Sequence, residues 1–162
     1  MPNIYLSIGS NIDRERNIRS ALAVLKDLFG ELKVSDIYET EAVGFDGPPF
    51  YNLAVRFYSD KALSEIAKIL KQVEIQHGRS TQSAKFSGRT LDLDILLYGE
   101  LISEDDKLQV PREDILRYGF VLEPLAEIAP DNRHPVTQER FSEIWERFDK
   151  KGLKQRPVQA PW

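Results

Sequence analysis

Cysteine is absent from this 162-residue sequence. Without a thiol, the chain cannot build a disulfide framework, a thiolate nucleophile or a Cys-based structural zinc site. The absence also suits a reducing compartment. Histidine is scarce as well, since only His77 and His134 occur, and neither belongs to a Ser-His-Asp pattern. We therefore expect both rings to be structural, and the sequence gives little support to nucleophilic catalysis.

Long apolar runs are missing too. None approaches the roughly 20 residues that a membrane-spanning helix needs, and the first residues lack the basic start and apolar centre of a signal peptide. The net charge of -4 argues against a broad nucleic-acid footprint, because such surfaces gather Lys and Arg to neutralise phosphates. We expect a cytoplasmic protein that binds small molecules, with no nucleic acid or membrane as partner. The length suits one domain over residues 1–162.

Patterns of strand and helix alternate along the first two thirds of the chain. Strands are expected over residues 4–8, 32–38, 51–58 and 90–98. Apolar positions at helical spacing predict one helix that ends at Gly30 and a second that ends near Gly78. Two β-α-β units with extra C-terminal strands and helices favour an α+β fold close to the ferredoxin-like plan. The sheet is expected to be antiparallel or mixed, with helices on one or both faces.

The last third of the chain is predicted to be less regular. A short hairpin is expected over residues 101–110, followed by a short helix that Pro111 opens and Gly119 ends. An apolar stripe over residues 141–148 predicts a terminal helix that packs on the sheet. Residues 150–162 are expected to form an irregular tail.

Two aspartates stand in the most apolar of the expected strands. Side chains alternate along a strand with a rise of about 3.3 Å per residue, so Asp92 and Asp94 should share one face, with Cα atoms roughly 6.6 Å apart. Neighbouring carboxylates repel each other unless a cation neutralises them. Two Mg²⁺ ions suit this arrangement, since hard cations prefer oxygen ligands in phosphoryl-transfer sites. The alternative is a half-exposed strand whose aspartates face water.

Basic residues stand on both sides of this acidic pair in the sequence. A polar stretch over residues 79–88 is expected to be a mobile surface loop of the kind that closes over a ligand. A bound polyphosphate needs both cations and metal-binding carboxylates, so the basic set is a candidate phosphate site. Its members are Arg79, Lys85, Arg89, Lys107, Arg112 and Arg117. The alternative is an ordinary solvated surface.

Glycine-rich nucleotide motifs are not found. The sequence has no P-loop, and Gly9 lacks the spaced partners of a dinucleotide fingerprint. A nucleotide would therefore be held by side chains and metals. Gly9, Ser10 and Asn11 are expected to build the strand exit and the approach to the first helix.

Several segments resemble, in order, those of the 6-hydroxymethyl-7,8-dihydropterin pyrophosphokinase family of the folate pathway. The resemblance extends from Ile4 to about Pro135, and the most specific segment is the Arg-Thr-Leu-Asp-Leu-Asp strand that begins at Arg89. The other segments are Gly9-Ser10-Asn11, residues 50–55, Gly78-Arg79, residues 95–99, Val110-Pro111 and residues 120–130.

This resemblance implies a ferredoxin-like α+β fold and a pyrophosphoryl transfer from ATP to the pterin, with release of AMP. It implies two Mg²⁺ ions between the phosphates and the carboxylates of Asp92 and Asp94, and often a monomer. Catalytic roles fall on Arg79, Arg89, Asp92 and Asp94, and the pterin pocket on Thr40, Val43, Phe50, Asn52 and Phe120. Glu74, Arg79, Arg89 and Ile95 fall on the nucleotide side, where we also place the basic residues Lys85, Arg112 and Arg117.

The chain departs from the family pattern around the nucleotide. At the position of Arg112 the family usually has His, and at the position of Tyr118 it often has Arg. Within the expected loop, Phe86 replaces Trp, Gly88 replaces Pro, and Thr81 occupies a position that is often basic. We hypothesise that Arg112 or Arg117 supplies a replacement cation.

Two other functions fit the same residues. A metal-dependent nucleotidyl or glycosyl transferase also uses Asp-x-Asp, and a pterin-binding relative could have lost or altered its transfer activity.

Overall fold

The computed structural model describes residues 2–41, 47–78, 90–105 and 107–159. Its centre is a six-stranded sheet in the order β5-β1-β4-β3-β6, with β2 paired to β4. Every one of these pairs is antiparallel. The strands are β1 (Asn3–Ser10), β2 (Lys33–Val34), β3 (Ile37–Thr40), β4 (Phe50–Tyr58), β5 (Asp92–Tyr98) and β6 (Gln155–Val158).

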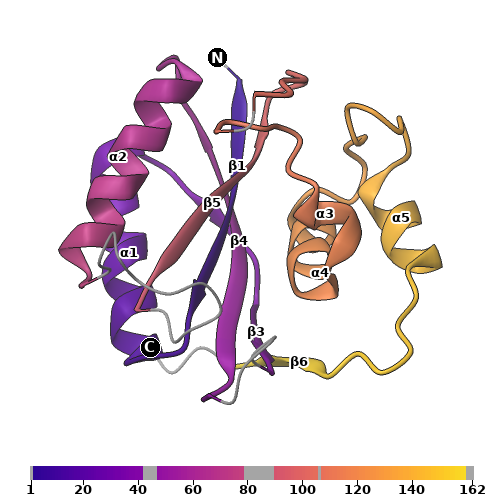
Figure 1. The fold of residues 1–162 in the computed structure, drawn as a ribbon, viewed down its shortest axis with the longest axis horizontal. Coiled ribbons are helices and arrows are strands. Elements are labelled where there is room, and N and C mark those ends of the chain that lie inside the picture. The colour runs from indigo at the N-terminus through magenta and orange to yellow at the C-terminus, as the bar shows by residue number, and fades with distance from the viewer. Residues whose placement is uncertain (1, 42–46, 79–89, 106, 160–162) are drawn as a thin grey trace.

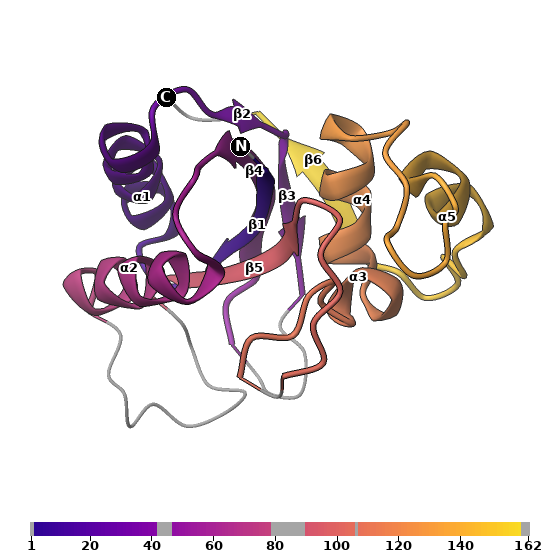
Figure 2. The ribbon, with the colours of Figure 1, turned by 90° about the horizontal axis from the view of Figure 1, so that it is seen from above.

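Helices cover both faces of the sheet (Figures 1 and 2). Helices α1 (Arg14–Phe29) and α2 (Leu63–Gln76) lie on one face, and α4 (Gly119–Ile128) packs on the other against β4, β3 and β1. The short α3 (Asp114–Arg117) and α5 (Phe141–Arg147) pack on α4. The chain order β1-α1-β3-β4-α2-β5, with β1 and β4 central, confirms the predicted ferredoxin-like α+β fold. No helix within the described ranges is long and apolar enough to cross a membrane.

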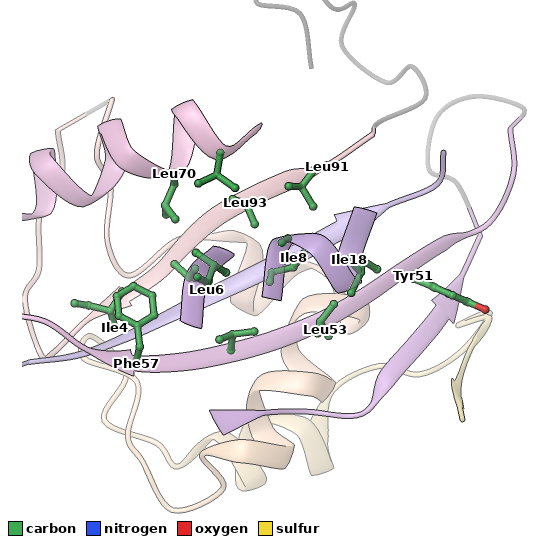
Figure 3. Close-up of a cluster of buried hydrophobic side chains, with 14 of the residues drawn as sticks. Ile4, Leu6, Ile8, Ile18, Tyr51, Leu53, Phe57, Leu70, Leu91 and Leu93 are labelled. Carbon is green, nitrogen blue, oxygen red and sulfur yellow. The ribbon is translucent and has the colours of Figure 1, made fainter. Parts of the chain in front are cut away.

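The sheet separates two hydrophobic clusters, one on each of its faces. Ile4, Leu6 and Ile8 of β1 are fully buried against the α1–α2 layer (Figure 3). Tyr5 belongs instead to the cluster beneath α4. Because side chains alternate along a strand, the next positions on the α4 side are Ser7 and Gly9.

The prediction of a single strand over residues 32–38 is wrong, because Ser35 interrupts the strand. The backbone N–H of Ser35 donates to the carbonyl of Ala54 at 3.0 Å, and the Ser35 hydroxyl accepts the N–H of Ala54 at 2.9 Å. A side-chain oxygen therefore takes a place that a backbone carbonyl fills in a regular ladder. The segment is split into β2 and β3.

The irregular last third was predicted least well. Among the described residues of 101–110, which exclude residue 106, the expected hairpin is reduced to one isolated antiparallel bridge, between Ser103 and Val110. Pro111 does not open a helix, since α3 begins at Asp114, and Gly119 begins α4 where it was expected to end a helix. Helix α4 is buried on nearly all sides, so its sequence lacks the alternation of apolar and polar faces from which a helix is predicted.

The two C-terminal elements also differ from expectation. Helix α5 packs on α4 and not on the sheet, because α4 already covers that face. The expected irregular tail contains β6, which pairs with β3 at the edge of the sheet.

Candidate active site

Three strands bring one residue each into a row on the α4 side of the sheet. Gly9 of the central strand β1 is the register partner of Asp92 on β5 and of Asn52 on β4. One step along, Ser7 is the partner of Asp94. Asp92 and Asp94 are both half-buried and alternate with Leu91 and Leu93, which lie in the opposite cluster. The two aspartates therefore share the face on which Asn52 lies.

Asn52 connects this row to the next strand. It is buried, and its Nδ2 donates to Oγ1 of the buried Thr40 on β3 at 2.7 Å. A Cβ added to Gly9 would lie 2.8 Å from the Asn52 Oδ1 and 3.7 Å from Cδ1 of Phe50. Such a short contact does not occur in real structures, so the Asn52 amide occupies the space that glycine leaves open over β1.

Two aromatic residues of the expected pterin pocket lie on β4 and α4. Phe50 opens β4, and Phe120 lies in the first turn of α4, where its ring stacks on that of Tyr118 with centroids 5.0 Å apart. Thr40 and Phe120 line a common groove of about 370 Å³. The structure thus brings together four of the five residues expected in a pterin pocket. The fifth, Val43, lies outside the described residues.

The acidic pair has a cation beside it. The Nη2 of Arg112 lies 3.7 Å from Oδ1 of Asp94, and its Nε donates to Oδ2 of Asp114 at 3.1 Å. Burial is the largest influence on the pKa of Arg112 and lowers it. The carboxylates of Asp94, Asp114 and Asp92 outweigh burial and leave that pKa above its ordinary value. Arg112 is therefore a permanent positive charge next to Asp94.

A cavity of about 190 Å³ opens beside the same strand, between α2, β5 and residues 107–112. It brings together three residues assigned to the nucleotide side, Glu74, Ile95 and Arg112, with the expected metal ligand Asp94. Glu74 also fastens α2 to β5, because its Oε2 accepts the backbone N–H of Leu93, between the two aspartates, at 2.8 Å. Lys107 of the basic set lines this cavity as well.

Other expected site residues lie elsewhere. Arg117 pairs with Glu113 at 3.5 Å and lines the groove beside Phe120, not the cavity with Asp94. Arg79, Lys85 and Arg89 lie outside the described residues.

One basic residue in the cavity was missed. Lys71 lines it and stands three residues before Glu74 on α2, a spacing that places both on one helix face. That spacing is visible in the sequence and could have suggested Lys71.

Asp92 and Asp94 are the residues expected to bind a metal. Within the described parts of the chain, no group of three or more His, Cys, Asp or Glu side chains is arranged to hold an ion. A pair of carboxylates is compatible with Mg²⁺, which commonly takes one or two carboxylates and completes its shell with water and substrate phosphates.

The Gly9-Ser10-Asn11 segment has the structural role that was expected. The Ser10 hydroxyl donates to the carbonyl of Ile12 at 3.1 Å, and Asn11 Nδ2 donates to the carbonyl of Pro48 at 3.1 Å. Arg14, the first residue of α1, donates to the carbonyl of Pro49 at 3.0 Å. The turn after β1 therefore holds the segment that leads into Phe50.

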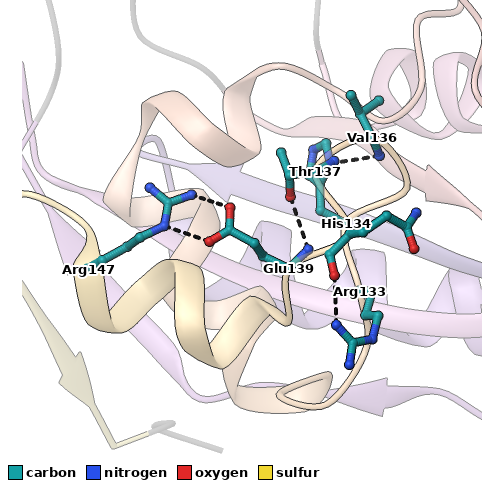
Figure 4. Close-up of polar contacts among 7 residues, drawn as sticks. Arg133, His134, Val136, Thr137, Glu139 and Arg147 are labelled. Carbon is teal, nitrogen blue, oxygen red and sulfur yellow. Dashed lines mark hydrogen bonds and ion pairs between the residues drawn. The ribbon is translucent and has the colours of Figure 1, made fainter.

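Both histidines are structural, as predicted. His77 bridges the carbonyl of Val73 and the Ser20 hydroxyl, which joins α2 to α1. His134 is buried in the loop between α4 and α5, and its Nδ1 accepts the backbone N–H groups of Val136 at 3.1 Å and Thr137 at 3.2 Å (Figure 4).

Comparisons with known proteins show the family and the fold of the chain. A family model described as 7,8-dihydro-6-hydroxymethylpterin-pyrophosphokinase matches residues 5–130. The chain is 41% identical over 133 residues to the 2-amino-4-hydroxy-6-hydroxymethyldihydropteridine pyrophosphokinase of Bacillus subtilis, a match that covers 79% of each chain. It is 32% identical to the protein of the same name from Aquifex aeolicus, over 89% of this chain and 91% of the other.

A solved structure shares the fold. The chain superposes on a Plasmodium falciparum HPPK-DHPS with a TM-score of 0.74 and 12% identity, over 97% of this chain. This chain spans only 45% of that longer protein.

Proposed function

Because the chain belongs to the 7,8-dihydro-6-hydroxymethylpterin-pyrophosphokinase family, we propose that it transfers the pyrophosphoryl group of ATP to the hydroxymethyl group of 6-hydroxymethyl-7,8-dihydropterin. The reaction gives the pterin diphosphate and AMP, as a step of folate biosynthesis. The observation that carries the proposal is the row in which Gly9 separates the carboxylate of Asp92 from the amide of Asn52. An acidic group for the phosphate side and an amide for the ring side are thereby adjacent.

The pterin occupies the side of this row toward β3. Asn52 pairs with the polar edge of the ring, Thr40 holds the Asn52 amide from behind, and Phe50 and Phe120 supply aromatic faces for the bicycle. Val43 is proposed to join them.

ATP occupies the side toward the sheet edge at β5. The cavity there combines the cations of Arg112, Lys107 and Lys71 with the apolar side chain of Ile95, which suits a phosphate chain attached to a base. Glu74 keeps β5 in place through the Leu93 N–H. Arg79, Lys85 and Arg89 are proposed to guide the phosphates, and Arg117 stays a weaker candidate because it lines the other groove.

Asp92 and Asp94 are proposed to bind two Mg²⁺ together with the phosphates. When bound, Mg²⁺ neutralises phosphate charge and makes a hydroxyl more acidic. Arg112 offsets the charge of Asp94.

The transfer itself requires little covalent chemistry from the protein. The pterin hydroxyl oxygen forms a bond to the β-phosphorus of ATP, and the bond from that phosphorus to the α,β-bridging oxygen breaks. AMP leaves with the electron pair of that bond, and the hydroxyl proton is released to solvent. Positioning and charge stabilisation supply most of the catalysis in such transfers. The structural roles of His77 and His134 agree with this.

A product assay tests the activity. Purified protein with hydroxymethyl-dihydropterin, ATP and Mg²⁺ should give AMP and the pterin diphosphate in equal amounts. Pterin binding with ATP left intact would instead indicate a relative without transfer activity. AMP formed without pterin would indicate simple hydrolysis, and turnover of a nucleotide sugar would favour the glycosyl transferase alternative.

Substitution of the aspartates tests the site. Asp92→Ala or Asp94→Ala should lower turnover by about a hundredfold or more, the scale expected for loss of one preorganised electrostatic group. Pterin affinity should be largely retained, because neither carboxylate lies in the aromatic pocket. Asp27→Ala, at an exposed aspartate of α1 on the opposite face, is the matched control. Near-normal rates in either site variant would contradict the metal assignment.

A monomeric state and a cytoplasmic location stay predictions. Size-exclusion chromatography with light scattering and cell fractionation would check them.

A further inference from the structure

The C-terminal strand β6 reaches the corner of the fold where the proposed pterin pocket lies. In the β3–β6 pair, Gln155 is the register partner of Thr40. The match to the family model ends at residue 130, so β6 lies outside the residues that this model matches. We propose that Gln155 is a positioning residue, which fixes Phe120 in the pterin pocket by holding the first turn of α4. The inference rests on the proposed pterin pocket and deepens it.

The side chain of Gln155 binds α4 directly. Its Nε2 donates to the carbonyl oxygen of Gly119 at 3.0 Å and to Oε1 of Glu123 at 2.7 Å. A Cβ added to Gly119 would lie 2.9 Å from both δ-carbons of Leu153, so the tail packs straight onto the glycine backbone. Gly119 directly precedes Phe120, so the position of its backbone determines where the Phe120 side chain leaves the helix.

The first turn of α4 needs such support from outside the helix. Its N-terminus has no side-chain cap hydrogen bond. Pro124 lies inside the helix and lacks an N–H, so it cannot donate to the carbonyl of Phe120 four residues earlier. A turn that lacks a cap and one internal bond is held less firmly by its own backbone. The bonds from Gln155 fall on this turn.

Gln155 joins two walls of the pocket that come from distant parts of the chain. Its backbone pairs with β3, which carries Thr40, and its side chain fastens the helix that carries Phe120. Removal of the side chain alone should keep β6 paired and let Phe120 shift away from Thr40. The cavity with Asp94 lies at β5, the opposite edge of the sheet from β6, so ATP binding should not change.

The test compares one substitution that keeps the length of the side chain with one that keeps a donor on a chain longer by one atom. Gln155→Met removes the donor, and we expect the Kd and KM for the pterin to rise about fivefold to tenfold, the scale of one hydrogen bond lost in an equilibrium constant. The KM for ATP should stay unchanged. Gln155→Lys restores a donor for Glu123 and the Gly119 carbonyl, and it should recover most of the pterin affinity. Binding is measured by titration calorimetry with the dihydropterin, Mg²⁺ and a non-transferable ATP analogue.

Two controls make the outcome decisive. Gln138→Ala removes a comparable side-chain bond, 2.8 Å to the carbonyl of Pro135, in the loop between α4 and α5, and should leave both substrates unaffected. Asn52→Ala tests the pocket itself, and unchanged pterin binding there would overturn the pocket assignment. If Asn52→Ala weakens pterin binding but Gln155→Met does not, or if Gln155→Met weakens ATP and pterin equally, the positioning role of Gln155 is refuted and the proposed function stands.

Discussion

Substitution of Gly9 by alanine perturbs the site through a single contact. The added Cβ would lie 2.8 Å from Oδ1 of Asn52, whereas its next neighbour, Cδ1 of Phe50 at 3.7 Å, is at an ordinary distance. Gly9 lies within the regular ladder of β1, where alanine meets no backbone restriction. Relief of the contact therefore requires the Asn52 amide to move, which weakens its 2.7 Å bond to Thr40.

The stability change and the binding change should separate in Gly9→Ala. Loss of one neutral hydrogen bond lowers the free energy of unfolding by about 1 kcal/mol. The reduced entropy of the unfolded chain on Gly→Ala offsets roughly 0.4–1 kcal/mol of that. Stability should thus change by about 1 kcal/mol or less. Pterin affinity should fall roughly tenfold or more, because the amide that we propose to pair with the ring is displaced.

Urea unfolding and pterin titration measure the two quantities, and Gly30→Ala is the control. Gly30 has φ of 85° and ψ of -145°, with no atom near an added Cβ, so alanine there costs on the order of 1–3 kcal/mol of backbone strain without touching the pocket. The double variant Gly9→Ala/Asn52→Ala should bind the pterin as Asn52→Ala does, since the displaced group is already gone. Wild-type pterin affinity in Gly9→Ala, or full additivity with Asn52→Ala, would refute this reasoning.

Three further predictions follow from contacts described above. Arg112→Ala should raise the KM for ATP about tenfold through loss of one charge-assisted contact, while Arg117→Ala changes this KM little. Equal effects of the two substitutions on the KM for ATP would contradict the proposal that Arg112, beside Asp94, contacts the nucleotide. Phe57→Ala should lower the free energy of unfolding by about 3–5 kcal/mol in urea titrations, because Phe57 is fully buried and stacks on Phe29 with centroids 4.1 Å apart; a loss below about 1 kcal/mol would be inconsistent with that burial. Burial lowers the pKa of His134 below 6.5, with the carboxylate of Glu139 opposing it, so the unfolded chain binds more protons than the folded chain as the pH falls. The stability that neutral His134 contributes is complete above about pH 6.5 and is lost below it, so the difference in unfolding midpoint between wild type and His134→Ala should narrow from pH 7.5 to pH 5; a constant difference would show that His134 does not titrate differently in the two states.

Local patterns in the sequence were enough to predict the helices and strands that bury only one face. Helix α1 ends at Phe29 and is followed by Gly30 with φ of 85°, as the apolar spacing and the terminal glycine predicted. The alternation of Leu91, Asp92, Leu93 and Asp94 likewise predicted which side chains share a face. Both patterns succeed because the period of a helix or strand is a property of a short segment, and one buried face selects it.

Contacts between distant segments decided what local patterns could not. Arg112 and Arg117 are equivalent by charge and are close in sequence, yet only Arg112 lines the cavity with Asp94, because the chain turns into α3 between them. Helix α4 has no amphipathic period since α5 and the sheet bury it from both sides.

The sequence by itself determined the family, the βαββαβ order and the residue types of the site, because motifs and periodicity are local properties of the chain. Tertiary structure alone placed Gly9 between Asp92 and Asn52 and brought Gln155 to Gly119. The physical reason is that strand register and the docking of β6 depend on pairing between segments far apart in the chain, and no short window of sequence contains both partners.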